Sequence, residues 1–120
     1  MELRDYIKTW IGTPYKWGGT DRAGIDCSGL IINIYQEFYR KPLPVRTTGQ
    51  MLEKFQPIQL TTAIAGDLIF FNTIKGPEAD HVGLYLGNNE FVHAGSKGVA
   101  IANLTSPYWK KAFVTVRHVG

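Results

Sequence analysis

Residues 81–94 read HVGLYLGNNEFVHA, in which two strand-forming runs flank a glycine and two asparagines. This pattern predicts an antiparallel hairpin. A two-residue turn would pair Leu84 with His93 and leave His81 on the other face, because a slip of one residue moves a side chain across the sheet. A three-residue loop instead pairs Gly83 with His93 and brings both histidines to one face, diagonally within side-chain reach. We expect this second register, because it gathers apolar residues on the opposite face, namely Val82, Leu84, Leu86, Val92 and Ala94.

Further strand-like runs follow or precede this hairpin, whereas helical periodicity occupies the first half of the chain. We expect strands at residues 67–72, 99–102 and 112–119. Three segments have a helical pattern. The first covers residues 2–11, where Leu3, Ile7, Trp10 and Ile11 share a face. The second is a long apolar segment from Asp26 or Cys27 to Arg40, and the third is a short segment through Gln50 to Phe55 with Thr47 or Thr48 as its cap.

Helices that precede strands, with short connections, are typical of an α+β fold with an antiparallel sheet. No linker, repeat or low-complexity segment interrupts the chain, so we expect residues 1–120 to form a single domain. Composition supports a globular protein, with 44% hydrophobic and 19% charged residues. No apolar run reaches the ~18 to 20 residues that span a bilayer.

Charge and cysteine content exclude several function classes. Thirteen Lys and Arg against ten Asp and Glu leave a net charge of +3, and no basic cluster follows a phosphate backbone, which argues against nucleic acid as a partner. A single cysteine permits no internal disulfide. The first residues show no signal-peptide pattern. A removed signal, another route of export and a cytosolic location all fit that observation.

Cys27 is the first candidate for chemistry. It stands in Asp26-Cys27-Ser28-Gly29, at the start of the long apolar helix. The first turn of a helix has unpaired N–H groups and the positive end of the dipole, and both favour a thiolate and a developing oxyanion. A small buried core residue is the alternative interpretation, since free cysteine is often buried.

The two histidines favour the catalytic interpretation. His81 or His93 can act as base to the Cys27 thiol while the other orients its ring. Two unrelated histidines at strand ends are the structural alternative. A metal site ranks third, because no close ligand pair such as CxxC or HxxxH is present. We therefore expect neither a metal nor a cofactor.

These segments resemble the NlpC/P60 family of cell-wall cysteine peptidases. The resemblance covers nearly the whole chain in order, and it rests on GTPYKWGG (12–19), DCSG (26–29), GDLIFF (66–71), HVGLYLG (81–87), FVHA (91–94), the residues Leu43, Pro44, Arg46, Thr47 and Gln50, and the pair Tyr108-Trp109. It implies a primitive papain-like α+β fold in which N-terminal helices pack on a central antiparallel sheet.

The resemblance also implies roles for individual residues. Cys27 matches the family's nucleophile, His81 its general base and His93 the polar third member of the triad. Tyr15 matches a tyrosine that lines the active site and helps to position substrate or oxyanion. The residues that flank the nucleophile, Asp26 and Ser28, match positions that contact the peptide stem.

The family's typical substrate is the stem peptide of peptidoglycan, cut between γ-D-glutamate and the diamino acid through a thioester. The nearest alternatives are an amidase that cuts between muramic acid and L-alanine, and a non-catalytic wall-binding module. We expect action at the cell wall or in the periplasm, by a protein that is a monomer. Delivery by a phage or secretion machine, with an immunity partner, would also fit a chain without a visible signal or second module.

Other residues carry weaker expectations. Trp17 either walls the substrate groove or pins its loop to the core. For Asp80, an exposed loop carboxylate is expected rather than a partner of His81, and Arg46 and Lys97 are expected to be solvated charges or binders of stem carboxylates. Structural roles are expected for Asp67, His118 and the pair Tyr108-Trp109.

Overall fold

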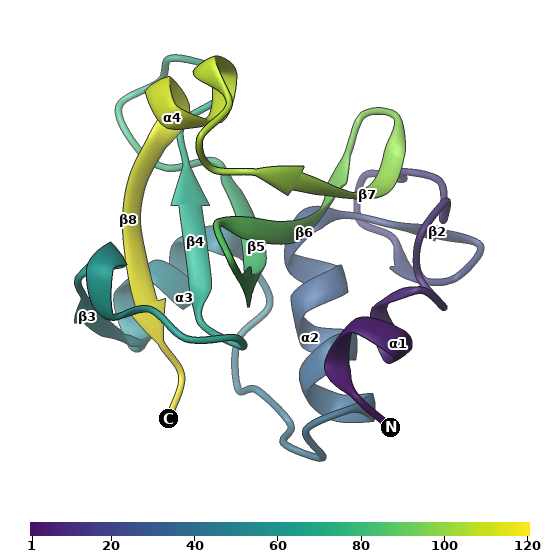
Figure 1. The fold of residues 1–120 in the computed structure, drawn as a ribbon. Coiled ribbons are helices and arrows are strands. Elements are labelled where there is room, and N and C mark those ends of the chain that lie inside the picture. Colours follow the sequence, from purple (N-terminus) through teal and green to yellow (C-terminus); the bar gives the residue numbers. More distant parts are fainter.

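A six-stranded antiparallel sheet forms the centre of the computed structural model, which describes residues 1–120 (Figure 1). Its strand order is β3-β8-β4-β5-β6-β7, with bounds β3 Gln56–Ile58, β4 Leu68–Phe71, β5 His81–Gly87, β6 Glu90–Gly95, β7 Gly98–Asn103 and β8 Phe113–His118. A separate two-stranded ribbon joins β1 Thr20–Asp21 to β2 Gly24–Ile25. The helices are α1 Leu3–Ile7, α2 Cys27–Glu37, α3 Thr48–Lys54 and α4 Pro107–Ala112, with a 3₁₀ turn at Leu60–Thr62.

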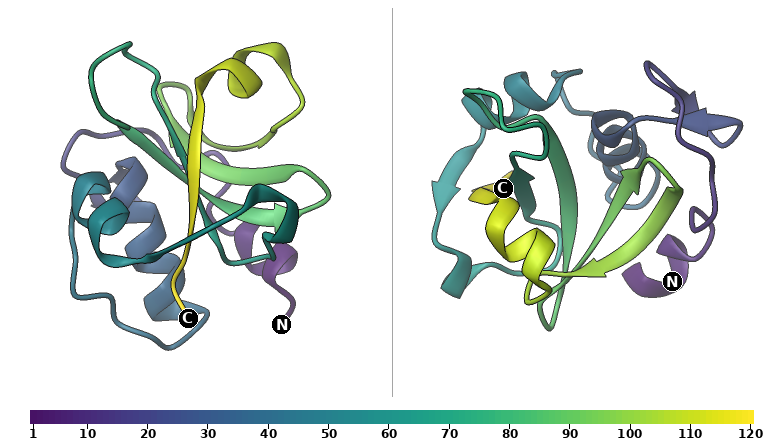
Figure 2. Two further views of the ribbon diagram at one scale, coloured as in Figure 1. Left: turned by 90° about the vertical axis from the view of Figure 1, so that its left-hand side faces the viewer. Right: turned by 90° about the horizontal axis from the view of Figure 1, so that it is seen from above.

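The sheet separates two apolar clusters. The larger one has 17 buried residues and joins α1 and α2 to one face of the sheet through side chains such as Leu30, Ile34, Leu84 and Val92. The smaller has 7 buried residues on the other face, where α4 packs through Trp109. Seen from above, α2 and α4 lie on opposite sides of β4 and β5 (Figure 2, right). The expected α+β architecture with helices on an antiparallel sheet is confirmed.

The hairpin of β5 and β6 has the register that the sequence predicts. Leu84 pairs with Val92 and Tyr85 pairs with Phe91, which continues to Gly83 opposite His93. Asn88 and Asn89 both have positive φ, at 53° and 64°, as a tight turn requires. The predicted three-residue loop is not present: Gly87 pairs with Glu90, so the turn has two residues, and an irregularity in β5 between Tyr85 and Gly87 restores the predicted register. Both histidines therefore lie on the face of the smaller cluster.

Two predicted helices end earlier than expected. The first helix stops at Ile7 because the N–H groups of Thr9 and Trp10 donate to carbonyls three residues back, which tightens the chain into turns. Trp10 is still buried, but Ile11 is 45% exposed. The second stops at Glu37 because Arg40 adopts a left-handed φ of 55° and the N–H of Lys41 bonds back to Tyr35 O.

The third helix matches its prediction, and Thr47 rather than Thr48 is its cap. The Thr47 hydroxyl accepts from Gln50 N at 3.1 Å, while the Gln50 side chain accepts from Thr47 N at 3.1 Å. This reciprocal pair is a capping box. The expected strands at 67–72, 99–102 and 112–119 are present within a few residues, whereas α4, β3 and the β1–β2 ribbon were not predicted.

Asp67 and His118 have structural positions, as expected. Asp67 is 2% exposed; it accepts from Ile64 N at 2.8 Å and lies 2.6 Å from His118 Nδ1, which ties the last strand to β4. None of the helices combines the length and apolar character needed to cross a membrane.

Candidate active site

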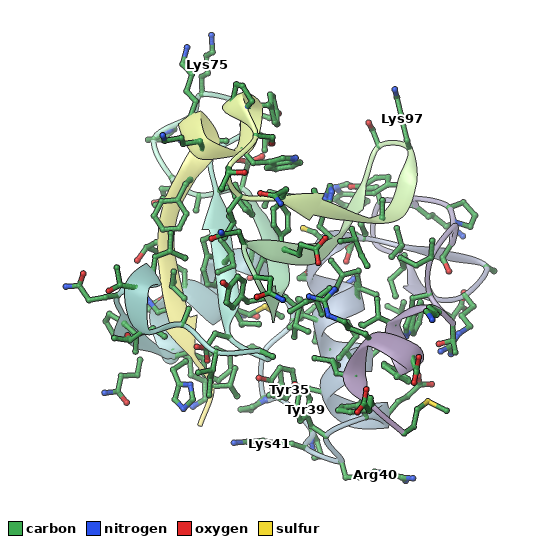
Figure 3. The ribbon with its side chains drawn as sticks, viewed as in Figure 1. Tyr35, Tyr39, Arg40, Lys41, Lys75 and Lys97 are labelled. Atoms are coloured by element: carbon green, nitrogen blue, oxygen red, sulfur yellow. The ribbon has the colours of Figure 1, made fainter.

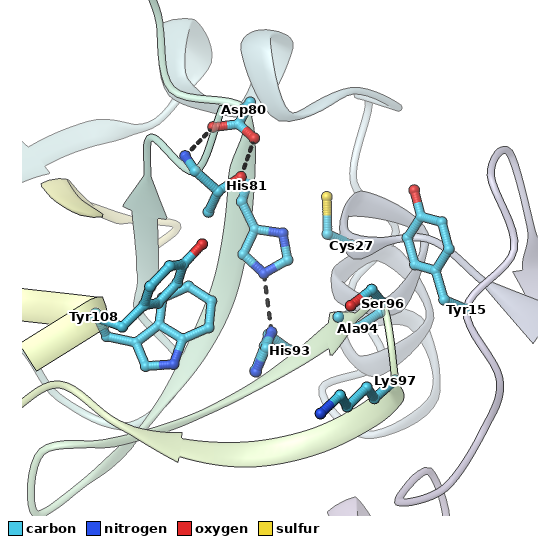
Figure 4. A pocket seen from close by; sticks show the side chains of 12 residues that line it. Tyr15, Cys27, Asp80, His81, His93, Ala94, Ser96, Lys97 and Tyr108 are labelled. Carbon is cyan, nitrogen blue, oxygen red and sulfur yellow. Dashed lines mark hydrogen bonds between the residues drawn. The ribbon is translucent and has the colours of Figure 1, made fainter. Parts of the chain in front are cut away.

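One cavity of about 840 Å³ contains Cys27 and both hairpin histidines. Its lining comes from the loop between α1 and β1, the first residue of α2, the loop between β4 and β5, the strands β5 and β6 with the turn after β6, and α4. The lining residues are Tyr15, Cys27, Thr73, Asp80, His81, His93, Ala94, Gly95, Ser96, Lys97, Tyr108 and Trp109. Three segments that are far apart in the sequence therefore meet at one place (Figure 4).

Cys27 is the first residue of α2 and is half-buried. Asp26 caps this helix by accepting from Gly29 N at 2.7 Å. The N–H groups of Cys27 and Ser28 have no acceptor in the chain, as is usual for the first turn of a helix. The Cys27 sulfur lies 3.5 Å from the Thr48 hydroxyl. The thiol is thus positioned beside free backbone donors that can stabilise negative charge.

His81 stands between the thiol and the second histidine. Its Nε2 lies 3.0 Å from Nδ1 of His93, and the two rings are nearly perpendicular, at 86°. Figure 4 shows the other ring nitrogen of His81, Nδ1, on the side of Cys27. If Nδ1 is to accept a proton from the thiol, Nε2 must carry the hydrogen and donate it to His93.

Burial keeps both imidazoles neutral. Desolvation lowers the pKa of His81 to about 4, against a smaller opposing effect of Asp80. Desolvation, together with the neighbouring His81, lowers the pKa of His93 to about 4. At neutral pH His81 therefore has a free lone pair, which a general base requires.

Trp109 covers the histidine pair on the side of α4. Its ring stacks on His81 at 5.7 Å and 23°, and it meets His93 at 4.8 Å and 72°. The pair Tyr108-Trp109 was predicted to have a structural role, and its place in the lining of the cavity was missed. Thr73 and Ser96 were missed as well. In the sequence, the only feature that could have indicated this part of the cavity is the adjacent aromatic pair Tyr108-Trp109.

Tyr15 lies on the opposite side of Cys27 from His81 (Figure 4). It is 41% exposed and lines the cavity. Desolvation by burial, with smaller effects of Cys27 and Asp26, raises the pKa of Tyr15 above its usual value. Its hydroxyl therefore stays protonated and can donate a hydrogen bond to an oxygen in the cavity.

The two residues that flank Cys27 contact Arg46 and do not line the cavity. Arg46 Nη2 pairs with Asp26 Oδ2 at 2.9 Å, and Arg46 Nη1 donates to Ser28 Oγ at 2.8 Å. Neither Asp26 nor Ser28 is part of the lining. Arg46 is therefore an ion-paired residue and not the solvated charge that was the main expectation.

Two further expectations need correction. Trp17 is 86% exposed and outside the lining, so it neither walls this cavity nor pins its loop. Backbone hydrogen bonds hold the loop instead, since Asp26 N donates to Gly19 O at 3.2 Å and Lys16 N donates to Ile25 O at 3.1 Å. The backbone of Gly24 comes so close that Gly19 has no room for a Cβ. Asp80 is half-buried rather than exposed, and it accepts from the backbone and hydroxyl of Thr73.

The sequence profile of the NlpC/P60 family matches residues 12–118. The chain belongs to the NlpC/P60 family. It is 40% identical over 118 residues to "Probable endopeptidase NlpC" of Escherichia coli K12, and the match covers 98% of this chain and 76% of that protein. It is 38% identical over 118 residues to "Murein DD-endopeptidase MepS/Murein LD-carboxypeptidase" of the same organism, covering 98% of this chain and 61% of that protein.

Solved structures of NlpC/P60 proteins have the same fold. An NLP/P60 family protein of Staphylococcus aureus Mu50 superposes with a TM-score of 0.86 at 35% identity, over 97% of this chain and 39% of that one. RipD of Mycobacterium tuberculosis, described as a non-catalytic NlpC/p60 domain protein adapted to peptidoglycan binding, gives a TM-score of 0.77 at 26% identity over 99% and 98%. The expected papain-like α+β fold is confirmed by these relatives.

Proposed function

We propose that this NlpC/P60 protein is a cysteine peptidase that hydrolyses amide bonds in the stem peptides of peptidoglycan at the cell wall. The observation that carries the proposal is the position of His81, whose Nε2 is held 3.0 Å from His93 while its other nitrogen is on the side of Cys27. Relatives named endopeptidases that act on murein support the substrate class.

The proposed reaction has two halves. Cys27 Sγ transfers its proton to His81 Nδ1 and attacks the amide carbon, and the oxyanion that forms is stabilised by the free N–H groups at the start of α2 and by the Tyr15 hydroxyl. His81 then protonates the leaving amine, and a thioester remains. In the second half His81 takes a proton from water, the hydroxide attacks the thioester, and the thiol is regenerated.

We propose the bond between γ-D-glutamate and the diamino acid as the first target, following the family resemblance. A second target is favoured by one observation: the relative MepS is named a DD-endopeptidase and LD-carboxypeptidase, which implies bonds at the D-amino acids of the stem. The muramoyl-L-alanine bond is the third. The three bonds release products of different mass.

Digestion of purified sacculi by the protein and by Cys27→Ala tests this proposal, with mass spectrometry of the soluble fragments. Cleavage at the γ-D-glutamyl bond by the unmodified protein alone supports both the bond and the nucleophile. Products cut at D-alanyl bonds would move the assignment to the MepS-like reaction. Equal cleavage by Cys27→Ala would exclude Cys27 as nucleophile. Because the chain has a single cysteine, one carboxamidomethyl adduct should abolish activity.

A binding module of the same fold is the rival function, and RipD gives it a precedent. A module that only binds has no need for a thiol beside two neutral imidazoles. Cosedimentation with sacculi separates the two functions. A protein that binds sacculi but releases no fragment, with its thiol confirmed as reduced, would favour the rival.

A further inference from the structure

A second cavity of about 460 Å³ adjoins the candidate active site. It is lined by Asn72, Thr73, Lys75, Tyr108, Lys111 and Ala112, and we refer to it as the lysine pocket. Thr73 and Tyr108 line both cavities, so a ligand in one can extend into the other.

The lysine pocket contains a buried acceptor without a partner. Asn72 Oδ1 is inaccessible to solvent and forms no hydrogen bond. The rest of this residue is committed, since its Nδ2 donates to Gly76 O at 2.6 Å and its backbone N–H donates to Ala112 O at 2.8 Å. An unsatisfied buried carbonyl is rare in a folded protein. Because this oxygen is closed to solvent, the lysines rather than Asn72 Oδ1 are the groups that a ligand in the pocket can reach.

The lysine pocket carries only positive charge. Lys75 and Lys111 are exposed, neither forms an ion pair, and no acidic side chain is part of the lining. Lys75 lies on the loop beside α4, at the edge of the molecule (Figure 3). Two free ammonium groups with no acidic side chain beside them suit a ligand that ends in an anion.

The direction of catalysis places the leaving half of the substrate on this side. His81 lies between Cys27 and Tyr108 (Figure 4). A general acid must reach the leaving nitrogen, so the leaving amine lies near His81 and not near Tyr15. From there the leaving peptide continues past Tyr108 toward the lysine pocket.

We propose that the lysine pocket binds the carboxyl terminus of the stem peptide in the leaving half of the substrate. Lys75 and Lys111 pair with the terminal carboxylate. This inference rests on the proposed function for its direction along the substrate. It makes the protein selective for stems with a free carboxyl terminus over stems in which that group is blocked.

Binding measurements on Cys27→Ala test the pocket without any turnover. The two probes are the tetrapeptide L-Ala-γ-D-Glu-L-Lys-D-Ala as the free acid and the same peptide as its C-terminal amide. Lysine at the third position makes the terminal carboxylate the only one in the leaving half. We expect calorimetry to show the acid binding about fivefold or more tightly than the amide, as for a partly exposed charge-assisted contact.

Lysine variants in the Cys27→Ala background locate the effect. Lys111→Gln should weaken binding of the acid and leave binding of the amide unchanged, so that the preference for the acid decreases. Lys110→Gln removes the same charge from the same helix but lies outside the pocket lining, and it should keep the preference. Equal affinity for acid and amide, or equal effects of the two lysine variants, would overturn the proposal.

A competition experiment separates a peptide carboxylate from a general anion site. Glycerol phosphate offers the negative charge without the peptide that extends from the active-site cavity, and we expect it to displace the acid only weakly. Displacement as effective as that by the peptide itself would overturn the assignment to a carboxyl terminus. Cleavage of sacculi by the unmodified protein reports on the proposed function separately. If sacculi are not cleaved but the acid is still preferred over the amide, the proposed reaction is refuted and the proposed binding pocket is retained.

Discussion

At the scale of single residues, two glycines make room for the histidine pair. A Cβ on Gly95 would lie 2.9 Å from His93 Cε1, and a Cβ on Gly83 would lie 2.7 Å from the ring of Phe91. Phe91 and His93 in turn contact each other at 5.3 Å between ring centroids. The orientation of the His93 ring therefore depends on the absence of side chains at neighbouring strand positions.

Gly95→Ala should displace the His93 ring, because real Cβ atoms do not approach a ring atom so closely. A displaced His93 loses its hydrogen bond to His81 and no longer orients that base, so kcat should fall by about tenfold or more with little change in KM. Steady-state kinetics on a soluble stem peptide measures kcat and KM separately. Gly49→Ala is the control, since a Cβ there meets nothing within 4 Å. An unchanged kcat in Gly95→Ala would show that the His93 ring is free to shift without cost.

At the scale of elements, the short helix α3 is stabilised mainly by its cap. It has seven residues and one buried side chain, Met51. Helices of this length are not stable by propensity alone. The capping box of Thr47 and Gln50 fixes the start of the helix, and the next residue, Thr48, carries the hydroxyl that lies beside the Cys27 sulfur. The cap thus also positions one wall of the thiol.

Thr47→Ala should lower the free energy of unfolding by about 1 kcal/mol, the typical loss for a threonine cap. Urea denaturation gives this difference directly. Thr61→Ala is a matched control, because Thr61 is exposed and its hydroxyl forms no hydrogen bond, and its effect should stay within about 0.5 kcal/mol. Equal effects of the two substitutions would mean that the cap does not stabilise α3.

At the scale of the whole molecule, the sheet sets the electrostatic environment of the site. β5 and β6 present apolar side chains to the larger cluster and the two histidines to the opposite side, where α4 covers them with Trp109. This cover removes water from the imidazoles and lowers the pKa of each to about 4. The fold therefore keeps both imidazoles neutral, and this lowers the stability of the folded protein at acid pH.

Global stability should fall as the pH is lowered from 6.5 toward 4. The unfolded chain binds protons at these histidines near their ordinary pKa of 6.5, whereas the folded protein binds them only near 4. Between these values the unfolded state carries more protons, so acid favours unfolding, by up to about 1.4 kcal/mol per pH unit for each imidazole. The full stability is present above pH 6.5.

Thermal unfolding from pH 7.5 to 4.5 measures this dependence. His93→Gln retains a polar group next to His81 but removes one titrating site, and its melting temperature should depend less steeply on pH. Glu37, whose pKa is lowered chiefly by its hydrogen bond to Arg22, acts in the same direction, but only below its ordinary value of 4.5. A melting temperature that stays constant from pH 6.5 to 5 would contradict the prediction.

Local patterns in the sequence determined the elements that hold the candidate site. The strand register at the histidines follows from alternation along β5 and β6, although the turn has two residues and an irregularity in β5 rather than the predicted three-residue loop. The helix α2 begins at Cys27 because Asp26 caps it, and α3 begins after Thr47 for the same reason. Such features depend on hydrogen bonds and side-chain periodicity within a few residues, which the order of amino acids specifies directly.

Only the tertiary structure decided what surrounds those elements. The stacking of Trp109 on His81, the pairing of Arg46 with Asp26, the exposure of Trp17 and the lysine pocket between α4 and the loop after β4 all join or separate residues that are distant along the chain. Their partners are chosen by packing and desolvation in three dimensions, and no local period records that choice. The sequence of this protein therefore determined which residues could react, and the packing of α4 on the sheet determined their protonation and the shape of the cavity beside them.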